Sequence, residues 1–244
     1  MTAQMNRLRH LSLALFFLLT PAVFASDAMP VPTSVAFIPR MSAEEIVERL
    51  RSSNEQRAAA LRAYDGNRTY SLSYRGFPSN HDAAEEVVVH YTAPGSKNFE
   101  VVAEHGSKML RSKVFAKLLE GEREAAHAEN QRQTALTEEN YAFTLIGQQP
   151  SPYGGCYRLG VEPRHESKFL YRGEICVNAK DFAVESIDAE PAKNPSFWIK
   201  KTRIEHRYQK IGEFWLPASN KTVSNVRLGG SATLSISYSA YSLR

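Results

Sequence analysis

The residues best suited to covalent chemistry are the two cysteines of the chain, Cys156 and Cys176. Both fall in stretches that alternate apolar and polar residues as consecutive strands do. A turn centred near Glu166 would place Cys156 opposite Cys176, and Arg158 opposite Glu174, which are two favourable cross-strand pairs. In an oxidising compartment this register predicts a structural disulfide. The alternative is that the cysteines are small buried apolar residues.

Motifs of catalysis and cofactor binding are missing from the sequence. It contains no Gly-x-Ser-x-Gly elbow, no phosphate loop, no Gly-x-Gly-x-x-Gly and no His-Glu-x-x-His. Two cysteines without a histidine at ligand spacing do not make a zinc site, so we expect no metal. We also expect no enzyme activity. An extracytoplasmic hydrolase is the alternative, supported only by His165-Glu166 and Glu205-His206, whose adjacent side chains diverge on a strand.

The most prominent side chains are aromatic and aliphatic residues at alternate positions of strand-like segments. On a single curved sheet one set of alternate residues faces the concave side, and helices that cover this side only in part leave a pocket for acyl chains. Full coverage would make the same residues an ordinary core. The candidate cavity residues are Tyr70, Leu72, Tyr74, Val87, Val89, Tyr91, Phe99 and Val101 from strands, and Leu118 from a helical stripe. Later strand-like segments carry further aromatic residues, namely Tyr141, Tyr157, Tyr171, Tyr208, Phe214, Trp215 and Tyr238.

The first element that positions these residues is a predicted helix over 42–64. Ser42 and Glu45 form a capping box at its start, apolar residues up to Tyr64 follow at helical spacing, and Asp65-Gly66 reads as its stop. Three strands with a period of two come next.

A second helical stretch is predicted over 107–133, with an apolar stripe in its first half and polar residues in its second. It is either a lid over a groove or a core helix with a solvated extension. Strands then continue to the end of the chain, about ten in all. The pattern predicts an α+β fold: one highly curved antiparallel sheet, a half-barrel of about ten to eleven strands, with helices covering its concave face.

The N-terminal region has the pattern of a targeting segment. Residues 1–25 combine arginines, the apolar run 11–19 and a small-residue site, as in a cleaved secretory signal peptide, although an uncleaved anchor is the alternative. Residues 26–40 read as a proline-containing linker, and 41–244 as one domain. We therefore expect a periplasmic protein that is not an integral membrane protein.

Composition excludes several classes of protein. With 244 residues, of which 43% are hydrophobic and 23% charged, the chain can bury a core and is neither collagen-like nor disordered. A net charge of +4 is too small to indicate nucleic-acid binding.

Three segments in the C-terminal half resemble a known family. In residues 176–188 a strand is followed by Asp, an aromatic residue and a second strand. Residues 203–219 contain a strand, a turn and the sequence Phe-Trp-Leu-Pro, and residues 231–241 form the closing strand. Together with the element order they resemble the LolA/LolB/RseB-like superfamily of outer-membrane lipoprotein-sorting proteins. The resemblance implies a periplasmic half-barrel without a cofactor, whose cavity receives lipoprotein acyl chains or serves as a lipid or envelope-stress sensor. It also implies an arginine in the cavity, for which Arg75 is the candidate.

These observations predict a monomeric periplasmic carrier or sensor for lipoproteins or other hydrophobic, acyl-chain ligands, without catalysis and with possible envelope protein partners. An envelope partner-binding protein with a filled core is a further alternative.

Overall fold

The computed structural model describes residues 39–125, 132–167, 169–194, 197, 199–227 and 229–244. The predicted signal peptide, 1–25, and all of the predicted linker but its last two residues lie outside this part of the chain. Within the described residues, no helix is both long and apolar enough to cross a membrane.

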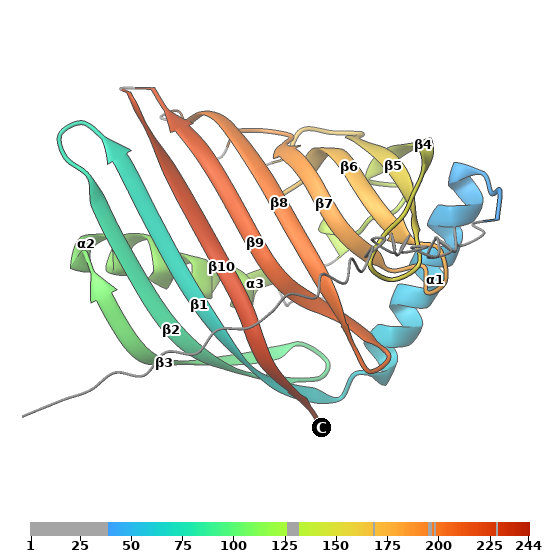
Figure 1. Cartoon of the computed structure of the whole chain (residues 1–244), viewed down its shortest axis with the longest axis horizontal. Coiled ribbons are helices and arrows are strands. Elements are labelled where there is room, and N and C mark those ends of the chain that lie inside the picture. The colour runs from blue at the N-terminus through green and yellow to red at the C-terminus, as the bar shows by residue number, and fades with distance from the viewer. Residues whose placement is uncertain (1–38, 126–131, 168, 195–196, 198, 228) are drawn as a thin grey trace, which may run out of the picture. The chain divides into compact units, whose positions relative to one another are not determined.

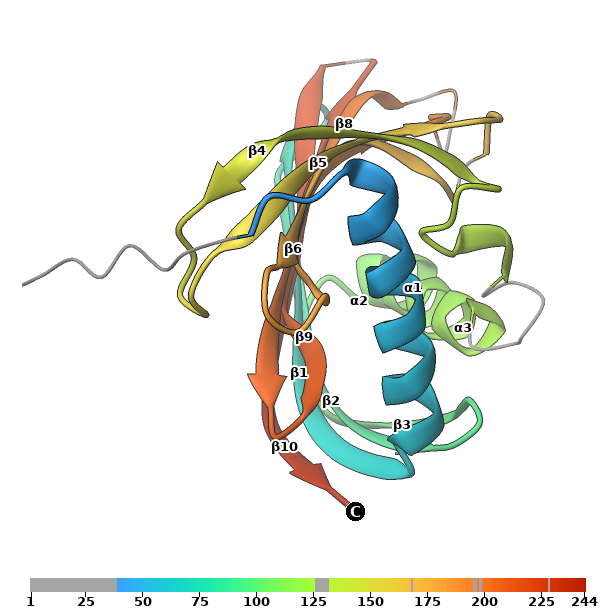
Figure 2. The same cartoon turned by 90° about the vertical axis from the view of Figure 1, so that its right-hand side faces the viewer.

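The strands form one antiparallel sheet with the order β3-β2-β1-β10-β9-β8-β7-β6-β5-β4 (Figure 1). Their bounds are β1 Ala63–Gly76, β2 His81–Thr92, β3 Ser96–Gly106, β4 Tyr141–Gln149, β5 Cys156–Pro163, β6 Tyr171–Asn178, β7 Val184–Pro191, β8 Ile199–Ile211, β9 Phe214–Val226 and β10 Gly230–Leu243. The sheet is strongly curved, and the helices lie on its concave side (Figure 2). The predicted fold class is confirmed.

The strand order explains why a helical segment crosses one face of the sheet. Strands β1 to β3 run outward to one edge of the sheet, whereas β4 lies at the other edge and the chain returns from it until β10 pairs with β1. The connection between β3 and β4 must therefore cross a face of the sheet. The helical segment after β3 begins this crossing on the concave side (Figures 1 and 2).

Helix α1 (Ala43–Ala60) covers one half of the concave face. Its start is the predicted capping box, in which the Ser42 amide donates to Glu45 at 2.9 Å and the Glu45 amide donates to the Ser42 hydroxyl at 3.2 Å. Ile46, Val47 and Leu50 are buried against strands β4 to β7. This packing forms the first of two core clusters, which we call the α1 cluster.

The predicted end of this helix is wrong. The helix ends at Ala60, and Tyr64, Asp65 and Gly66 belong to strand β1. Pairing of β1 with both β2 and β10 outweighs the local helix pattern there. Gly66 is not a helix stop but allows close approach of a ring, because a Cβ atom at this position would lie 3.1 Å from Cδ1 of Tyr241.

The second helical stretch has three parts: helix α2 (Lys108–Leu110), a π-helical turn (Arg111–Phe115) and helix α3 (Ala116–Ala125). Phe115 and Leu119 are buried against residues of β1, β2 and β10. This packing forms the second core cluster, which we call the α3 cluster. The first half of the stretch is therefore a core helix, and residues 126–131 of the polar half lie outside the described part.

The hairpin that carries the cysteines differs in register from the prediction. Cys156 lies opposite Asn178, and Arg158 opposite Cys176, so the strands are shifted by two residues. A shift of two keeps every side chain on its predicted face. The cysteines are thus diagonal neighbours with a Cα–Cα distance of 5.6 Å, and they form a disulfide. Arg158 and Glu174, also predicted to be opposite each other, are diagonal neighbours that form an ion pair.

Candidate functional site

The two core clusters do not meet, and a cavity of about 940 Å³ lies on the concave face of the sheet. Its lining combines residues of α1 and α3 with residues of the central strands β8, β9 and β10. The volume is in the range of ligand pockets in proteins.

Most of the cavity wall is apolar. The central strands contribute Tyr208, Leu216, Leu234, Ile236 and Tyr238. The remaining wall includes Ala58 and Leu61 near the end of α1, Leu118 of α3, and Ala135 and Leu136. The apolar part of this wall favours a hydrocarbon chain.

A charged cluster lies in the wall near α3. Arg68 of β1 pairs with Glu122 of α3, and the ammonium of Lys97 on β3 lies 3.7 Å from the same carboxylate. The Tyr70 hydroxyl accepts a hydrogen bond from Arg68 at 3.1 Å and donates one to Glu122 at 3.2 Å. We call Arg68, Lys97, Glu122 and Tyr70 the Arg68 cluster.

The guanidinium of Arg68 is enclosed by aromatic rings. It lies 5.5 Å from the ring centre of Phe99 and 5.0 Å from that of Tyr238, and the side chain is 5% exposed. Burial by itself would lower the pKa of Arg68, but Glu122 and Tyr70 raise it above its ordinary value. Burial lowers the pKa of Lys97 and raises that of Tyr70 to about 12. The arginine is therefore a fixed cation in the cavity wall.

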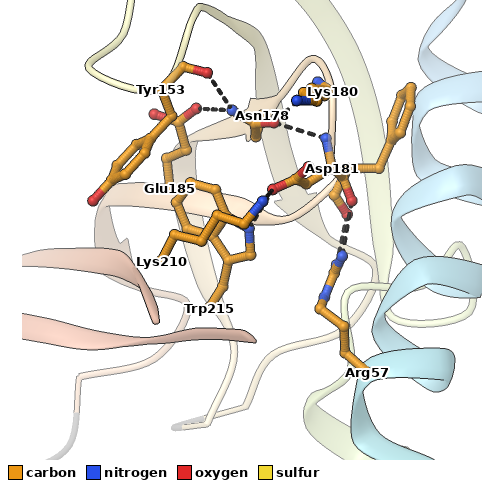
Figure 3. A network of polar contacts seen from close by, with 9 residues as sticks. Arg57, Tyr153, Asn178, Lys180, Asp181, Glu185, Lys210 and Trp215 are labelled. Carbon is orange, nitrogen blue, oxygen red and sulfur yellow. Dashed lines mark hydrogen bonds and ion pairs between the residues drawn. The ribbon is translucent and has the colours of Figure 1, made fainter. Parts of the chain in front are cut away.

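The cavity also reaches Trp215 of β9 and Arg57 of α1, which a second polar network holds in place (Figure 3). Asp181 accepts a hydrogen bond from the Trp215 indole at 3.1 Å and forms an ion pair with Lys210 at 2.7 Å. Arg57 donates to the carbonyl oxygens of Asp181 and Phe182 at 2.8 and 2.9 Å. The turn between β6 and β7 is thus bound to both α1 and the β8–β9 hairpin.

Asn178, at the start of this turn, stabilises it through side-chain hydrogen bonds (Figure 3). Its side-chain oxygen accepts the amides of Lys180 and Asp181 at 2.9 and 2.7 Å, and its amide group donates to buried Glu185 at 2.7 Å. Burial raises the pKa of Glu185. Phe182 adopts the left-handed backbone conformation, φ 48°, within the same turn. The asparagine thus fixes the loop on which the position of Trp215 depends.

Four of the residues predicted to line a cavity are core residues instead. Tyr70, Leu72, Val87 and Val89 are buried in the α3 cluster, which corresponds to the alternative of ordinary core packing. Among the predicted residues, Leu118 lines the cavity.

The other predicted residues lie at the margins of the α3 cluster or beyond it. The Phe99 ring packs against the cluster, and the Tyr91 ring stacks on that of Tyr64 at 5.0 Å between centres. The Tyr74 hydroxyl donates to the Phe77 carbonyl oxygen, and Val101, on edge strand β3, is 44% exposed.

Arg75 is not the arginine of this cavity. Its side chain is half exposed and pairs with Asp82 at 2.8 Å. The buried arginine in the wall is Arg68, which lies on the same face of β1 as Tyr70 and Leu72, whereas Arg75 has the opposite parity. Strand alternation alone was therefore a sufficient signal to prefer Arg68.

Histidine chemistry has little support in the cavity. His206 lines it, and burial lowers the pKa of His206. The neighbouring Glu205 carboxylate forms an ion pair with Arg203 and not with the His206 ring. In the described ranges no hydrogen bond joins the His206 ring to a serine, a cysteine or a carboxylate, and no group of three or more acidic, His or Cys residues suits a metal ion.

Solved structures resemble this chain in the course of the backbone. A DUF1329 family protein from Desulfovibrio piger shares 12% identity over 84% of this chain and 94% of that chain, with a TM-score of 0.40. An outer membrane lipoprotein-sorting protein domain from Vibrio parahaemolyticus shares 11% identity over 83% and 93%, with a TM-score of 0.41. A LolA superfamily protein from Nitrosomonas europaea shares 11% over 84% and 94%, with a TM-score of 0.33.

No protein-family model matches the sequence, and no curated protein matches it. The similar structures include the superfamily that the sequence resembles. Similarity at this level concerns the backbone and not what the cavity holds.

Proposed function

We propose that this chain is a non-catalytic periplasmic carrier or sensor that holds the hydrocarbon chain of a lipidated or otherwise amphiphilic ligand on the concave face of its sheet. The observation that carries the proposal is the apolar cavity of about 940 Å³ on the concave face, where the α1 and α3 clusters do not meet. The periplasmic part of the proposal is supported by the leader pattern of 1–25.

The apolar wall contributes a driving force for binding of such a ligand. Burial of one methylene contributes about 0.8 kcal/mol, so a chain with about ten buried methylenes gains roughly 8 kcal/mol before the cost of association. Association removes several kcal/mol of this gain. About 4 kcal/mol then remains, which corresponds to a dissociation constant in about the millimolar range for the hydrocarbon chain alone.

Two matched variants test where the ligand binds. Leu234 lies in the cavity wall, whereas Ser237, three residues further along β10, is exposed on the other face. Leu234→Trp narrows the cavity and should weaken binding of a fluorescent fatty-acid analogue at least tenfold, and Ser237→Trp should leave it unchanged. Equal effects of the two variants would place the ligand elsewhere.

The natural ligand is sought by mass spectrometry of organic extracts of the purified protein. We expect a lipid or lipidated peptide that is depleted in the Leu234→Trp variant. A protein with no extracted lipid and no saturable binding of the analogue would contradict the proposal and favour a filled core that serves partner binding.

A further inference from the structure

We infer that the ligand of this cavity is an amphiphile with a single anionic head group, and that Arg68 and Lys97 bind this group. The inference rests on the proposed function, because it names the head group of the same ligand. A carboxylate and a phosphodiester both have this chemistry.

The first argument is the charge of the Arg68 cluster. Two cations, Arg68 and Lys97, share one carboxylate, that of Glu122. Arg68 is almost fully buried, and the other two side chains are about a quarter exposed. An excess of positive charge with little access to water is unfavourable, and one bound anion would balance it.

The second argument is the unused hydrogen-bonding capacity of Arg68. The hydrogen bonds to Tyr70 and Glu122 both leave from one nitrogen, Nη1. The Tyr64 hydroxyl is a third hydrogen-bond partner of this guanidinium. Because a guanidinium has five N–H donors, two donors remain for an oxygen anion. The rings of Phe99 and Tyr238 both contact the guanidinium, and its planar fork suits two parallel bonds to a carboxylate or a phosphate.

The third argument is the position of the cluster relative to the apolar wall. Tyr238 contacts Arg68, and Ile236 and Leu234 lie next to it on the same face of β10 and in the same cavity wall. A head group at Arg68 can thus be followed by a chain along the sheet. The other arginine of the wall, Arg57, already donates to two carbonyl oxygens and to Asn54.

The test compares ligands that differ only in the head group. Dodecanoate is compared with dodecanol, and lysophosphatidylglycerol with the monoacylglycerol of the same chain, which lacks the phosphodiester, by calorimetric titration. We expect about a ten- to hundredfold preference for the anionic member of at least one pair, the effect of a hydrogen bond to a charged group. A larger preference within the dodecanoate pair indicates a carboxylate head group, and a larger preference within the lysophosphatidylglycerol pair indicates a phosphodiester.

Variants of the cluster assign the effect to its residues. Arg68→Met and Lys97→Met should each reduce the preference for the anionic member of a pair. Glu122→Gln removes the competing carboxylate and should strengthen anion binding severalfold. Glu120→Gln on the same helix, where the carboxylate pairs with Arg123, is the matched control and should change neither.

The failures of the two proposals are distinguishable. Equal binding within both pairs, or weaker anion binding by Glu122→Gln, would overturn the inference and leave the hydrophobic cavity in place. No saturable binding of any of the four ligands would overturn the proposed function as well. Glu122→Gln keeps the inference testable if Arg68→Met does not fold.

Discussion

Replacement of Asn178 by alanine should destabilise the protein and disturb one wall of the cavity. The side chain makes four hydrogen bonds, to the amides of Lys180 and Asp181, to the Glu185 carboxylate and to the Tyr153 carbonyl oxygen. At about 1 kcal/mol each, their loss amounts to about 4 kcal/mol. For a domain of this size that corresponds to a fall of about 10 °C in Tm.

The measurement is thermal unfolding followed by circular dichroism, together with the fluorescence of Trp215 in a Trp198→Phe background. Trp215 should become more mobile, because Asn178 fixes the turn whose Asp181 binds the indole. The control is Asn98→Ala, at an exposed position of β3, which should change Tm by less than about 2 °C. If Asn178→Ala unfolds at the temperature of this control, the turn is not held as described.

Three further predictions concern stability. Burial raises the pKa of Glu185 above its unfolded value of 4.5. The stability that the protonated carboxyl contributes is therefore present below pH 4.5 and is lost as the pH rises through the folded pKa. Glu185→Gln should raise Tm more at about pH 8 than at about pH 4, and an equal change in Tm at both would contradict this. The double variant Cys156→Ala, Cys176→Ala removes the disulfide that closes a loop of 20 residues, and it should lower the free energy of unfolding by about 3 kcal/mol. Two reactive thiols in the denatured, unreduced wild-type protein would contradict this prediction. Gly66→Ala should destabilise by about 1 kcal/mol or more because its Cβ meets a ring, whereas Gly121→Ala in α3, with open space around it, should stabilise by up to about 1 kcal/mol; the opposite signs, measured by urea unfolding, would refute the packing described.

The sequence predicts the sheet well because alternation is a local signal. Residues 231–239 of β10 alternate cleanly, and their pairing with β1 leaves Leu234 and Ile236 on the concave side with Tyr70 and Leu72. The end of helix α1 is predicted less well, since Tyr64 continues the helical spacing although two neighbouring strands bind its backbone.

The site is harder to predict, because it depends on which strands meet. Tyr208 and Trp215 were recognised as aromatic strand residues, but nothing in their local sequence shows that β8 and β9 lie in the uncovered middle of the sheet. Tyr70 and Val87 have the same local pattern and lie beneath the α3 segment. Coverage by helices, a property of the tertiary structure, decides between core and cavity.

The most direct test of the central claim is quenching of Trp215 by a bound chain. Trp215 lines the cavity, and in the Trp198→Phe variant it is the remaining tryptophan. Titration with dodecanoate that carries bromine at its terminal carbon should quench this fluorescence to saturation, and unbrominated dodecanoate should reverse the quenching by competition. Binding without any quenching, or quenching that does not saturate, would contradict a hydrocarbon chain in this cavity.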